Sequence, residues 1–503
     1  MTKKNNRPRI LFLTPEVAYL PRGMGNMSDY VSAKGGGVAD VSAVLVRALF
    51  EQGVDVHVAL PDFRKIFHRR LSPLMEGDFT KIQNRIPEER VHFAKDRCFF
   101  YVDQISYGGG LKNTKLALAF QREIINNIIP RVQPDLIHCN DWMTGLIPAQ
   151  AKRMDIPCLY TIHNIYSTKC PLAYMEDMGI DTAFFWRNLF FEYFPLSYEE
   201  SREANQVDFL TSGVFGANFV NTVSPSFLTE MIRGQYNWVN MHLKIELANK
   251  LNAGCAVSIL NAPDPSFDPM TDKALFRRFS ANDHYSGKQY NKLFLQEKLG
   301  LIMDSRAPVF FWPSRLDGFQ KGCQLLAEIL TDLIFSYRDR NLEIIFVADG
   351  EFNRHFKHIV KSHILENRVA VCDFEEQLAR LAYGAADFVL MPSRFEPGGL
   401  PQMIGPLYGA LPVAHDTGGI HDTVVPLNME AGTGNGFLFK TFDAKGLLWA
   451  IEQALAFYDF DPNVKAGQIE RIMTQSAAQF NYRTTARQYI DIYESMVQRP
   501  LIN

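Results

Sequence analysis

The chain has 503 residues, 47% of them apolar and 21% charged, with a formal net charge of −3 at pH 7. This length is too great for a single hydrophobic core, so we expect two or three domains of a globular protein. The small net charge gives no large basic surface of the kind that binds nucleic acid or an anionic membrane. No stretch reaches the ~18–20 apolar residues of a membrane helix.

The seven cysteines are scattered, odd in number and never spaced as a CxxC pair. This pattern predicts reduced, buried thiols and no metal site. The first apolar run, residues 10–13, is too short for the core of a signal peptide. We therefore expect a cytoplasmic protein.

The first half of the chain alternates strand and helix patterns. Residues 9–14 form an apolar run that predicts a strand, and a long loop leads to a glycine-rich stretch at residues 34–37. Apolar residues at helical spacing follow, ended by Gly53 and then by a second apolar run at residues 54–60. Strand, loop, helix and strand in this order predict a parallel sheet.

Gly36 and Gly37 lie at the start of this predicted helix. Without side chains, they let backbone N–H groups approach an anion at the positive end of the helix dipole, and Lys34 adds a charge. A flexible loop that uses glycine only for its turns is an equally good interpretation.

Three further predicted strands, at residues 136–139, 157–162 and 219–223, each end in polar side chains. Because the carboxyl ends of parallel strands meet at one edge of a sheet, Asp141 and His163 predict a ligand site there. Helix N-capping is the alternative role for Asp141. For His163 taken alone, a core histidine bonded to backbone is the favoured interpretation.

Residues 184–198 contain eight aromatic side chains. We favour packing in the core or between the subunits of a homo-oligomer. A platform on which sugars stack is the alternative.

A proline-rich stretch at residues 261–269, followed by polar sequence, predicts a crossing between domains. Beyond it the alternation restarts, with apolar runs at residues 309–312, 342–348, 368–372, 388–391 and 412–415. We predict an α/β fold of two doubly wound, Rossmann-like domains at residues 1–262 and 306–480, joined by a crossing at 263–305. A helical segment at 481–503 is expected to pack back on the first domain.

Charged residues follow the predicted strands of the second domain. Glu396 comes after the buried run 388–391, and Arg315 and Lys321 come after the first strand of this domain. Two cations at a strand end suit a diphosphate, because arginine grips phosphate oxygens bidentately and lysine supplies a compact charge. Backbone N–H groups of residues 417–419 can add to the same anion site. Solvated surface charges, and a Glu396 that only caps a helix, are the alternatives.

Together these motifs resemble the bacterial glycogen synthase and plant starch synthase family over nearly the whole chain. The stretches that carry the resemblance are Lys34-Gly35-Gly36-Gly37, His138 with Asp141-Trp142, Thr161-Ile162-His163-Asn164, Val223-Ser224-Pro225, Ile259-Leu260-Asn261, Ser314-Arg315-Leu316, Gln320-Lys321-Gly322, residues 392–402 and Thr417-Gly418-Gly419. The resemblance implies the GT-B fold, in which two Rossmann-like domains face a deep interdomain cleft. It also implies an enzyme that transfers glucose with retention from ADP-glucose to the non-reducing end of an α-1,4-glucan, with neither metal nor cofactor.

The same resemblance implies a role for each residue of the site. Arg315 and Lys321 would hold the donor diphosphate, and Glu396 would bind sugar hydroxyls and steady charge at the reacting carbon. His163 would face the glucose, and Asp141 would position donor or acceptor. Further substrate contacts would come from Lys34, Gly36, Gly37, Asn164, Phe374 on the base, Gly398, Gly399, Leu400, Thr417, Gly418 and Gly419. Because the motifs contain no clear nucleophile below the anomeric carbon, we expect front-face attack in which the departing phosphate takes the acceptor's proton.

Several positions depart from the family pattern. Residues 20–33 form an insertion, and an extra residue lies between Arg315 and Lys321. Gly398 and Pro401 replace the usual cysteine and threonine of their loop. These departures leave open a related transferase with a different donor or a small-sugar acceptor, or an inactive glucan-binding relative.

Overall fold

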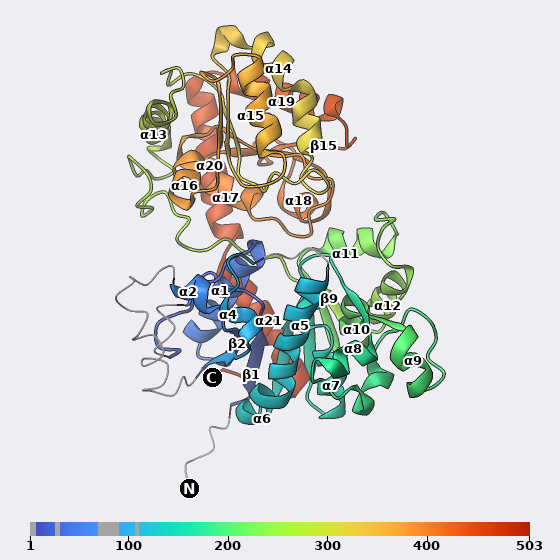
Figure 1. The fold of residues 1–503 in the computed structure, drawn as a ribbon. Helices are drawn as coiled ribbons and strands as arrows, with labels where there is room; N and C mark the ends of the chain where they lie inside the picture. The colour runs from blue at the N-terminus through green and yellow to red at the C-terminus, as the bar shows by residue number, and fades with distance from the viewer. Residues whose placement is uncertain (1–6, 26–30, 69–89, 106–109, 503) are drawn as a thin grey trace. The chain divides into compact units, whose positions relative to one another are not determined.

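The computed structural model describes residues 7–25, 31–68, 90–105 and 110–502. The chain divides into two compact units: unit 1 comprises Met1–Asn261 with Tyr482–Asn503, and unit 2 comprises Ala262–Asn481. Figure 1 labels the elements of both units. Residues 26–30 of the predicted insertion lie outside the described residues.

Unit 1 is built on a seven-stranded sheet with the strand order β3-β2-β1-β4-β5-β8-β9. Its strands are β1 Arg9–Leu13, β2 Asp55–Pro61, β3 Val91–Ala94, β4 Leu136–Asn140, β5 Cys158–Ile162, β8 Phe219–Thr222 and β9 Ala256–Ser258. Every neighbouring pair is parallel, and Ile10 of β1 pairs with Val56 on one side and Leu136 on the other. The predicted parallel sheet is therefore confirmed. A separate antiparallel pair joins β6 Lys169–Pro171 and β7 Gln206–Asp208.

Helices cover this sheet, as buried parallel strands require. They are α1 Gly37–Glu51, α2 Arg64–His68, α4 Arg97–Phe100, α5 Leu111–Glu123, a π-helical turn Ile124–Ile128, α6 Ile129–Val132, α7 Ile147–Arg153, α8 Leu172–Asp177, α9 Tyr198–Ala204, α10 Phe209–Gly216, α11 Pro225–Ile232, α12 Met241–Asn252 and α21 Tyr482–Val497. The predicted helix after the glycine-rich loop is α1, which buries apolar residues at helical spacing.

The C-terminal helix α21 is fixed to unit 1 by buried polar contacts. Tyr493 Oη lies 2.7 Å from His138 Nδ1, and Tyr489 Oη accepts a hydrogen bond from Asn221 Nδ2 at 2.9 Å. These contacts tie α21 to β4, the central strand of the sheet, and to β8, which lies next to the edge strand β9.

Unit 2 contains a six-stranded parallel sheet with the order β12-β11-β10-β13-β14-β15. Its strands are β10 Val309–Trp312, β11 Glu343–Val347, β12 Val369–Cys372, β13 Phe388–Met391, β14 Leu411–His415 and β15 Phe437–Phe439. Its helices are α13 His284–Leu299, α14 Cys323–Ser336, α15 Asn353–Ser362, α16 Glu376–Ala385, α17 Pro401–Leu407, α18 Gly418–Thr423, α19 Ala444–Tyr458 and α20 Pro462–Gln479.

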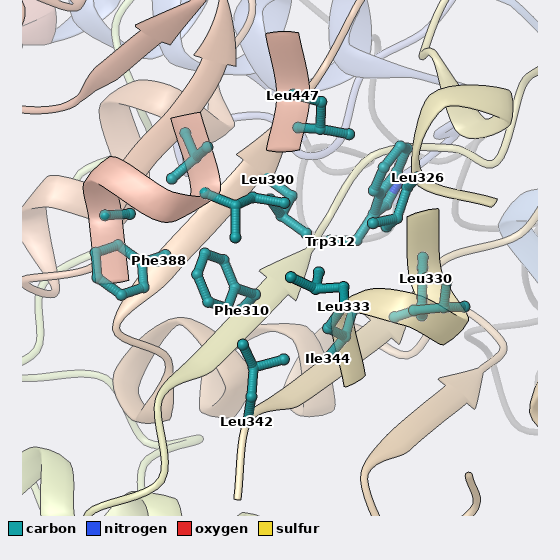
Figure 2. Packing of buried hydrophobic residues seen from close by; sticks show 14 of the residues in the cluster. Phe310, Trp312, Leu326, Leu330, Leu333, Leu342, Ile344, Phe388, Leu390 and Leu447 are labelled. Carbon is teal, nitrogen blue, oxygen red and sulfur yellow. The ribbon is translucent and has the colours of Figure 1, made fainter. Parts of the chain in front are cut away.

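Both faces of this second sheet are packed. Phe310 and Trp312 of β10 enter one hydrophobic cluster, shown in Figure 2 with leucines of α14, while Val309 and Phe311 enter the cluster on the other face. A strand buried on both sides needs an uninterrupted apolar run. For this reason the positions of these strands could be predicted well from the apolar runs in the sequence.

Residues 263–305, expected to be a crossing between domains, belong instead to unit 2. Their helix α13 packs against α16. Lys292 Nζ donates to Asp387 Oδ2 at 2.6 Å, and Lys288 Nζ donates to two backbone carbonyls, those of Ala386 and Tyr408. The polar composition that suggested a linker thus includes lysines whose ammonium groups are paired inside the unit.

The aromatic segment at residues 184–198 is divided between core and surface. Phe185 and Phe191 are 2% and 5% exposed, which confirms core packing for these two. Phe184 and Phe194 are 61% and 85% exposed.

Two findings concern the chain's general class. No helix in the described part of the chain is both long enough and apolar enough to span a bilayer. All seven cysteines are free thiols.

Candidate active site

In unit 1 the polar ends of β4 and β5 meet, as predicted. Asn140 Nδ2 donates to the carbonyl of Leu13 at 2.8 Å, and Asn140 Oδ1 lies 2.8 Å from His163 Nε2. Because the Asn140 amide nitrogen is bound to a carbonyl, its oxygen must be the acceptor for the ring. His163 therefore carries its proton on Nε2.

Asp141 holds the loop that follows β5. Its Oδ1 accepts the backbone N–H groups of His163 at 2.7 Å and Asn164 at 3.2 Å. Its own backbone has φ 57° and ψ 178°, a costly conformation for a residue with a side chain. Asp141 precedes a 3₁₀ turn at Trp142–Thr144 but makes no side-chain capping bond to it, so the capping alternative is wrong.

Burial sets the charge states of this pair. It raises the pKa of Asp141 to about 7, against the two backbone N–H groups that lower it. Burial also lowers the pKa of His163 to about 4, so the imidazole is neutral at pH 7. His163 Nδ1 is buried and has no hydrogen-bond partner among the described residues. The ring therefore bonds to a side chain and not to backbone, and it keeps one lone pair for a donor such as a sugar hydroxyl.

The glycine-rich loop of unit 1 is already engaged by a carboxylate. Glu16 Oε2 accepts the backbone N–H of Gly35 and, at 3.0 Å, that of Gly36, while Lys34 pairs with Asp40 at 2.8 Å. Gly37 begins α1, and a methyl group at this position would meet no atom within 4 Å. The predicted anion donor at Gly36 is thus occupied, and the open approach to the helix start is at Gly37.

Glu16 was missed from the sequence. It is fully buried and lies in the loop after β1, separated from the strand by Thr14 and Pro15, whereas Asp141 follows β4 directly. The weaker signal of a carboxylate close to the end of an apolar strand would have identified it.

In unit 2, Glu396 lies in the loop after β13 with its carboxylate held from two sides. Lys321 Nζ donates to Oε2 at 2.6 Å, and Ser393 Oγ donates to the same oxygen at 2.9 Å. The Glu396 side chain is 7% exposed and that of Lys321 is 12% exposed. Two predicted site residues, 75 positions apart in the sequence, are therefore in direct contact.

Arg315 lies on the same loop as Lys321 but is exposed and makes no ion pair with the described residues. Asp317 shapes this loop by accepting the N–H groups of Phe319 at 2.9 Å and Gln320 at 2.8 Å. The sequence pattern predicts a helix from Gln320, but this turn occupies the residues before Cys323, where α14 starts.

The loop of Glu396 and the turn before α18 are packed backbone to backbone. Gly419 N donates to the carbonyl of Glu396 at 2.8 Å, and a Cβ on Gly419 would lie 2.1 Å from the carbonyl oxygen of Gly398. Gln402 Nε2 donates to that same oxygen at 2.7 Å. The Gly419 amide, expected to bind phosphate, thus serves to fix the Glu396 loop.

The remaining predicted contacts surround this loop. Gly399 has φ +71°, which glycine tolerates, and Leu400 precedes α17. Thr417 and Gly418 lie at the start of α18. Phe374 follows β12, donates its backbone N–H to Asp349 Oδ1 at 2.9 Å and leaves its ring 46% exposed.

Within the described ranges, no group of three or more histidine, cysteine, aspartate or glutamate side chains could hold an ion. The charges that unit 2 offers are instead a guanidinium, an ammonium and a carboxylate on adjoining loops, a set suited to an anionic leaving group bound to a sugar.

Known proteins resemble this chain over nearly its whole length. A family model described as starch synthase catalytic domain matches residues 9–244, and one described as glycosyl transferases group 1 matches residues 307–456. The glycogen synthase of Moorella thermoacetica is 32% identical over 98% of this chain and 98% of its own length. That of Exiguobacterium sibiricum is also 32% identical, over 92% of this chain and 95% of its own.

Solved structures show the fold. The catalytic domain of starch synthase IV from Arabidopsis thaliana, bound to ADP and acarbose, has a TM-score of 0.78 at 24% identity and covers 98% of this chain and 100% of that one. Sucrose-phosphate synthase from Thermosynechococcus elongatus has a TM-score of 0.58 at 17% identity, with the same coverage. The two Rossmann-like units are those of the GT-B fold, and the chain belongs to the glycogen synthase family of glucosyltransferases.

Proposed function

We propose that this enzyme transfers glucose from ADP-glucose, with retention, to the 4-hydroxyl at the non-reducing end of an α-1,4-glucan. The observation that carries the proposal is the buried contact of Glu396 with Lys321 and Ser393, in a chain 32% identical to a glycogen synthase over nearly its full length. The seven free thiols suit the reducing environment of the cytoplasm, where we place the enzyme.

In this proposal unit 2 binds the donor. Arg315, which is exposed and unpaired among the described residues, and Lys321 bind the diphosphate. A lysine ammonium has three N–H donors, so Lys321 can keep its bond to Glu396 while donating to a phosphate oxygen. These cations stabilise the charge that develops on the leaving diphosphate, a role that other enzymes give to a divalent ion. The exposed ring of Phe374 stacks on the adenine.

Glu396 acts as a sugar-binding and charge-stabilising group. Its Oε2 accepts two hydrogen bonds, from Lys321 and Ser393, which withdraw electron density and fix its orientation. Oε1 takes no hydrogen bond from the described residues and is the oxygen left for sugar hydroxyls. A carboxylate restrained in this way is a poor attacking group, so we favour front-face attack, with the acceptor proton passing to the departing phosphate. A trapped covalent glycosyl–enzyme adduct would overturn this step.

In unit 1, His163 and Asp141 act on the glucose. The neutral His163 offers the Nδ1 lone pair to a sugar hydroxyl. Asp141 acts on the glucose indirectly, because its two hydrogen bonds position the backbone of His163 and Asn164.

The test is a screen of donors against acceptors. Purified enzyme should release ADP from ADP-glucose in the presence of glycogen and extend it with α-1,4 linkages, and should act poorly with UDP-glucose or with small sugars. Glu396→Gln should lower turnover by roughly two or more orders of magnitude. The control is Glu343→Gln: Glu343 is also a buried carboxylate, bonded to Gln296, and its replacement should leave turnover unchanged. Release of UDP, transfer to a small sugar, or glycogen binding without any nucleotide release would each refute the proposal.

A further inference from the structure

Asn140, the last residue of β4, connects three neighbouring strand ends of unit 1. Its Nδ2 donates at 2.8 Å to the carbonyl of Leu13, the last residue of β1. Its Oδ1 lies 2.8 Å from Nε2 of His163, the first residue after β5. The sheet order places β4 between β1 and β5, so a single side chain joins the ends of all three strands. Asn140 is only 1% exposed, so water does not compete for either partner.

The Leu13 carbonyl fixes the orientation of the Asn140 amide. A backbone carbonyl can only accept a hydrogen bond, so the amide atom that faces it must be the nitrogen. The flipped amide would bring two oxygens to this distance and would lose a buried hydrogen bond, which is costly. The amide oxygen of Asn140 therefore faces the imidazole of His163.

The fixed amide oxygen in turn fixes the proton of the imidazole. The ring of His163 is neutral at pH 7, because burial lowers its pKa to about 4. A neutral imidazole has one N–H and one lone pair, and the oxygen of Asn140 selects Nε2 for the N–H. Nδ1, which is buried and has no hydrogen-bond partner among the described residues, is left as a pure acceptor.

Two consecutive residues thus hold His163 at two points. Asp141 Oδ1 accepts the backbone N–H of His163 at 2.7 Å, and Asn140 Oδ1 accepts the N–H of its ring. The first contact places the residue, and the second sets the rotation of the ring and the position of its proton. The acceptor atom Nδ1 is therefore aimed before any substrate binds, as preorganised sites require.

We propose that Asn140 is a positioning residue of the transfer reaction, which makes His163 a hydrogen-bond acceptor toward the sugar. The inference rests on the proposed function for the group that Nδ1 receives, a hydroxyl of the transferred glucose. A hydroxyl can donate to this lone pair, whereas the other tautomer of the ring would present an N–H there. The buried Asn140 acts on the sugar only through His163.

A double-mutant cycle tests whether Asn140 acts through His163. Asn140→Leu keeps the approximate shape of the side chain and removes both of its polar ends. Because the ring then loses its fixed proton, kcat with ADP-glucose and glycogen should fall about tenfold. The same change made in a His163→Ala background should lower kcat less than about twofold further. A second tenfold loss in that background would show that Asn140 only supports the fold, and would overturn the proposal.

Asn221→Leu is the matched control. Asn221 of β8 is a fully buried asparagine of the same sheet, and it bonds to the N–H of Ile259 at 3.0 Å and to Tyr489, not to a histidine. Its replacement should lower the melting temperature, as Asn140→Leu does, but should leave kcat within about twofold of the unmodified enzyme. An equal loss of kcat in the two variants would assign the effect to lost stability and would count against the proposal.

The tautomer can be measured without any substrate. In protein labelled with ¹⁵N-histidine, the ring signals of His163 are those absent from His163→Ala. They should show a protonated Nε2 and an unprotonated Nδ1 at pH 7, a mixture of tautomers in Asn140→Leu, and no change in Asn221→Leu. A protonated Nδ1 in the unmodified enzyme would overturn the proposal even if Asn140→Leu does not fold.

These measurements keep the role of Asn140 distinct from the proposed function. If the enzyme does not use ADP-glucose, the cycle is repeated with the nucleotide sugar that it does use. Coupling in that cycle, together with the expected change of tautomer, would leave the role of Asn140 standing while the proposed function falls. If glucose is transferred from ADP-glucose to glycogen but the tautomer is the same with and without Asn140, the role of Asn140 falls alone.

Discussion

The contact between Lys321 and Glu396 can be tested for stability and for catalysis in the same set of variants. The pair is close, at 2.6 Å, and its side chains are only 12% and 7% exposed. Lys321→Met leaves the carboxylate buried with Ser393 as its remaining partner, and breaking one side of such a pair costs roughly 3–5 kcal/mol. Since Lys321 keeps some contact with water, we expect a loss of about 3 kcal/mol in the free energy of unfolding.

The double variant gives the decisive comparison. Glu396→Gln alone should cost about 2 kcal/mol, because the buried ammonium loses its counter-charge while the amide oxygen still accepts a hydrogen bond. In Lys321→Met with Glu396→Gln neither charge remains, so the loss should be about 1–2 kcal/mol, well below the sum of the single losses. All three variants should lose turnover, since the recovery of stability does not restore either charge.

Urea unfolding and ADP release with glycogen measure the two effects. A control is Arg340→Met, which breaks the exposed pair with Asp459 (42% and 49% exposed) and should cost under about 1 kcal/mol with normal turnover. Additive losses in the double variant would refute the coupling between Lys321 and Glu396. Normal turnover in the double variant would remove both residues from the active site.

Three further predictions follow from the other site residues. Arg315→Ala should raise the KM for the nucleotide sugar about tenfold or more with an unchanged melting temperature, because the side chain is exposed and unpaired among the described residues; a loss of stability without a change in KM would contradict its role. Asp141, with its pKa raised from 3.8 to about 7, keeps a proton that the unfolded chain releases, so stability should fall by up to about 4 kcal/mol as pH rises from about 4 to 7. Asp141→Asn should flatten this slope in urea unfolding at several pH values, and an identical slope would disprove the assignment. Gly419→Ala, whose Cβ would lie 2.1 Å from a backbone oxygen, should lower both melting temperature and turnover, whereas Gly467→Ala, with no atom within 4 Å, should lower neither.

Strands were the most predictable part of the fold because they are buried on both faces. Such strands need continuous apolar runs, and β13 was predicted from end to end at residues 388–391. Helix starts were less predictable, since they depend on hydrogen bonds from side chains outside the helix. Asp317, for example, holds a turn just before α14 and moves the helix start past residue 320.

The segment at residues 263–305 shows a different limit. Its lysines and prolines suggest a solvated linker, but Lys288 and Lys292 are 5% and 3% exposed. A lysine can be buried when carbonyls or a carboxylate receive its ammonium group. Those partners, such as Asp387, come from distant parts of the sequence, so composition alone could not show that this segment is part of unit 2.

Site residues were predictable where strand ends define them. The polar residues after β4 and β5 identified Asp141 and His163, and the structure joins them by a hydrogen bond. What the backbone amides do was not predictable. The N–H groups of Gly36 and Gly419 are each bonded within the chain, one to Glu16 and one to a carbonyl, because the path of two loops brings an acceptor to each.

The two substitutions beside Glu396 alter its loop without altering its charge. Pro401 occupies the first position of α17, where a helix has no use for a backbone N–H. At Gly398 the structure depends on the carbonyl, which Gln402 holds at 2.7 Å, and not on a side chain. The bond between Glu396 and Lys321 involves neither position. Of these two substitutions, the one at Gly398 removes a side chain beside Glu396, so any change in substrate preference that comes from this loop would arise from the space at Gly398.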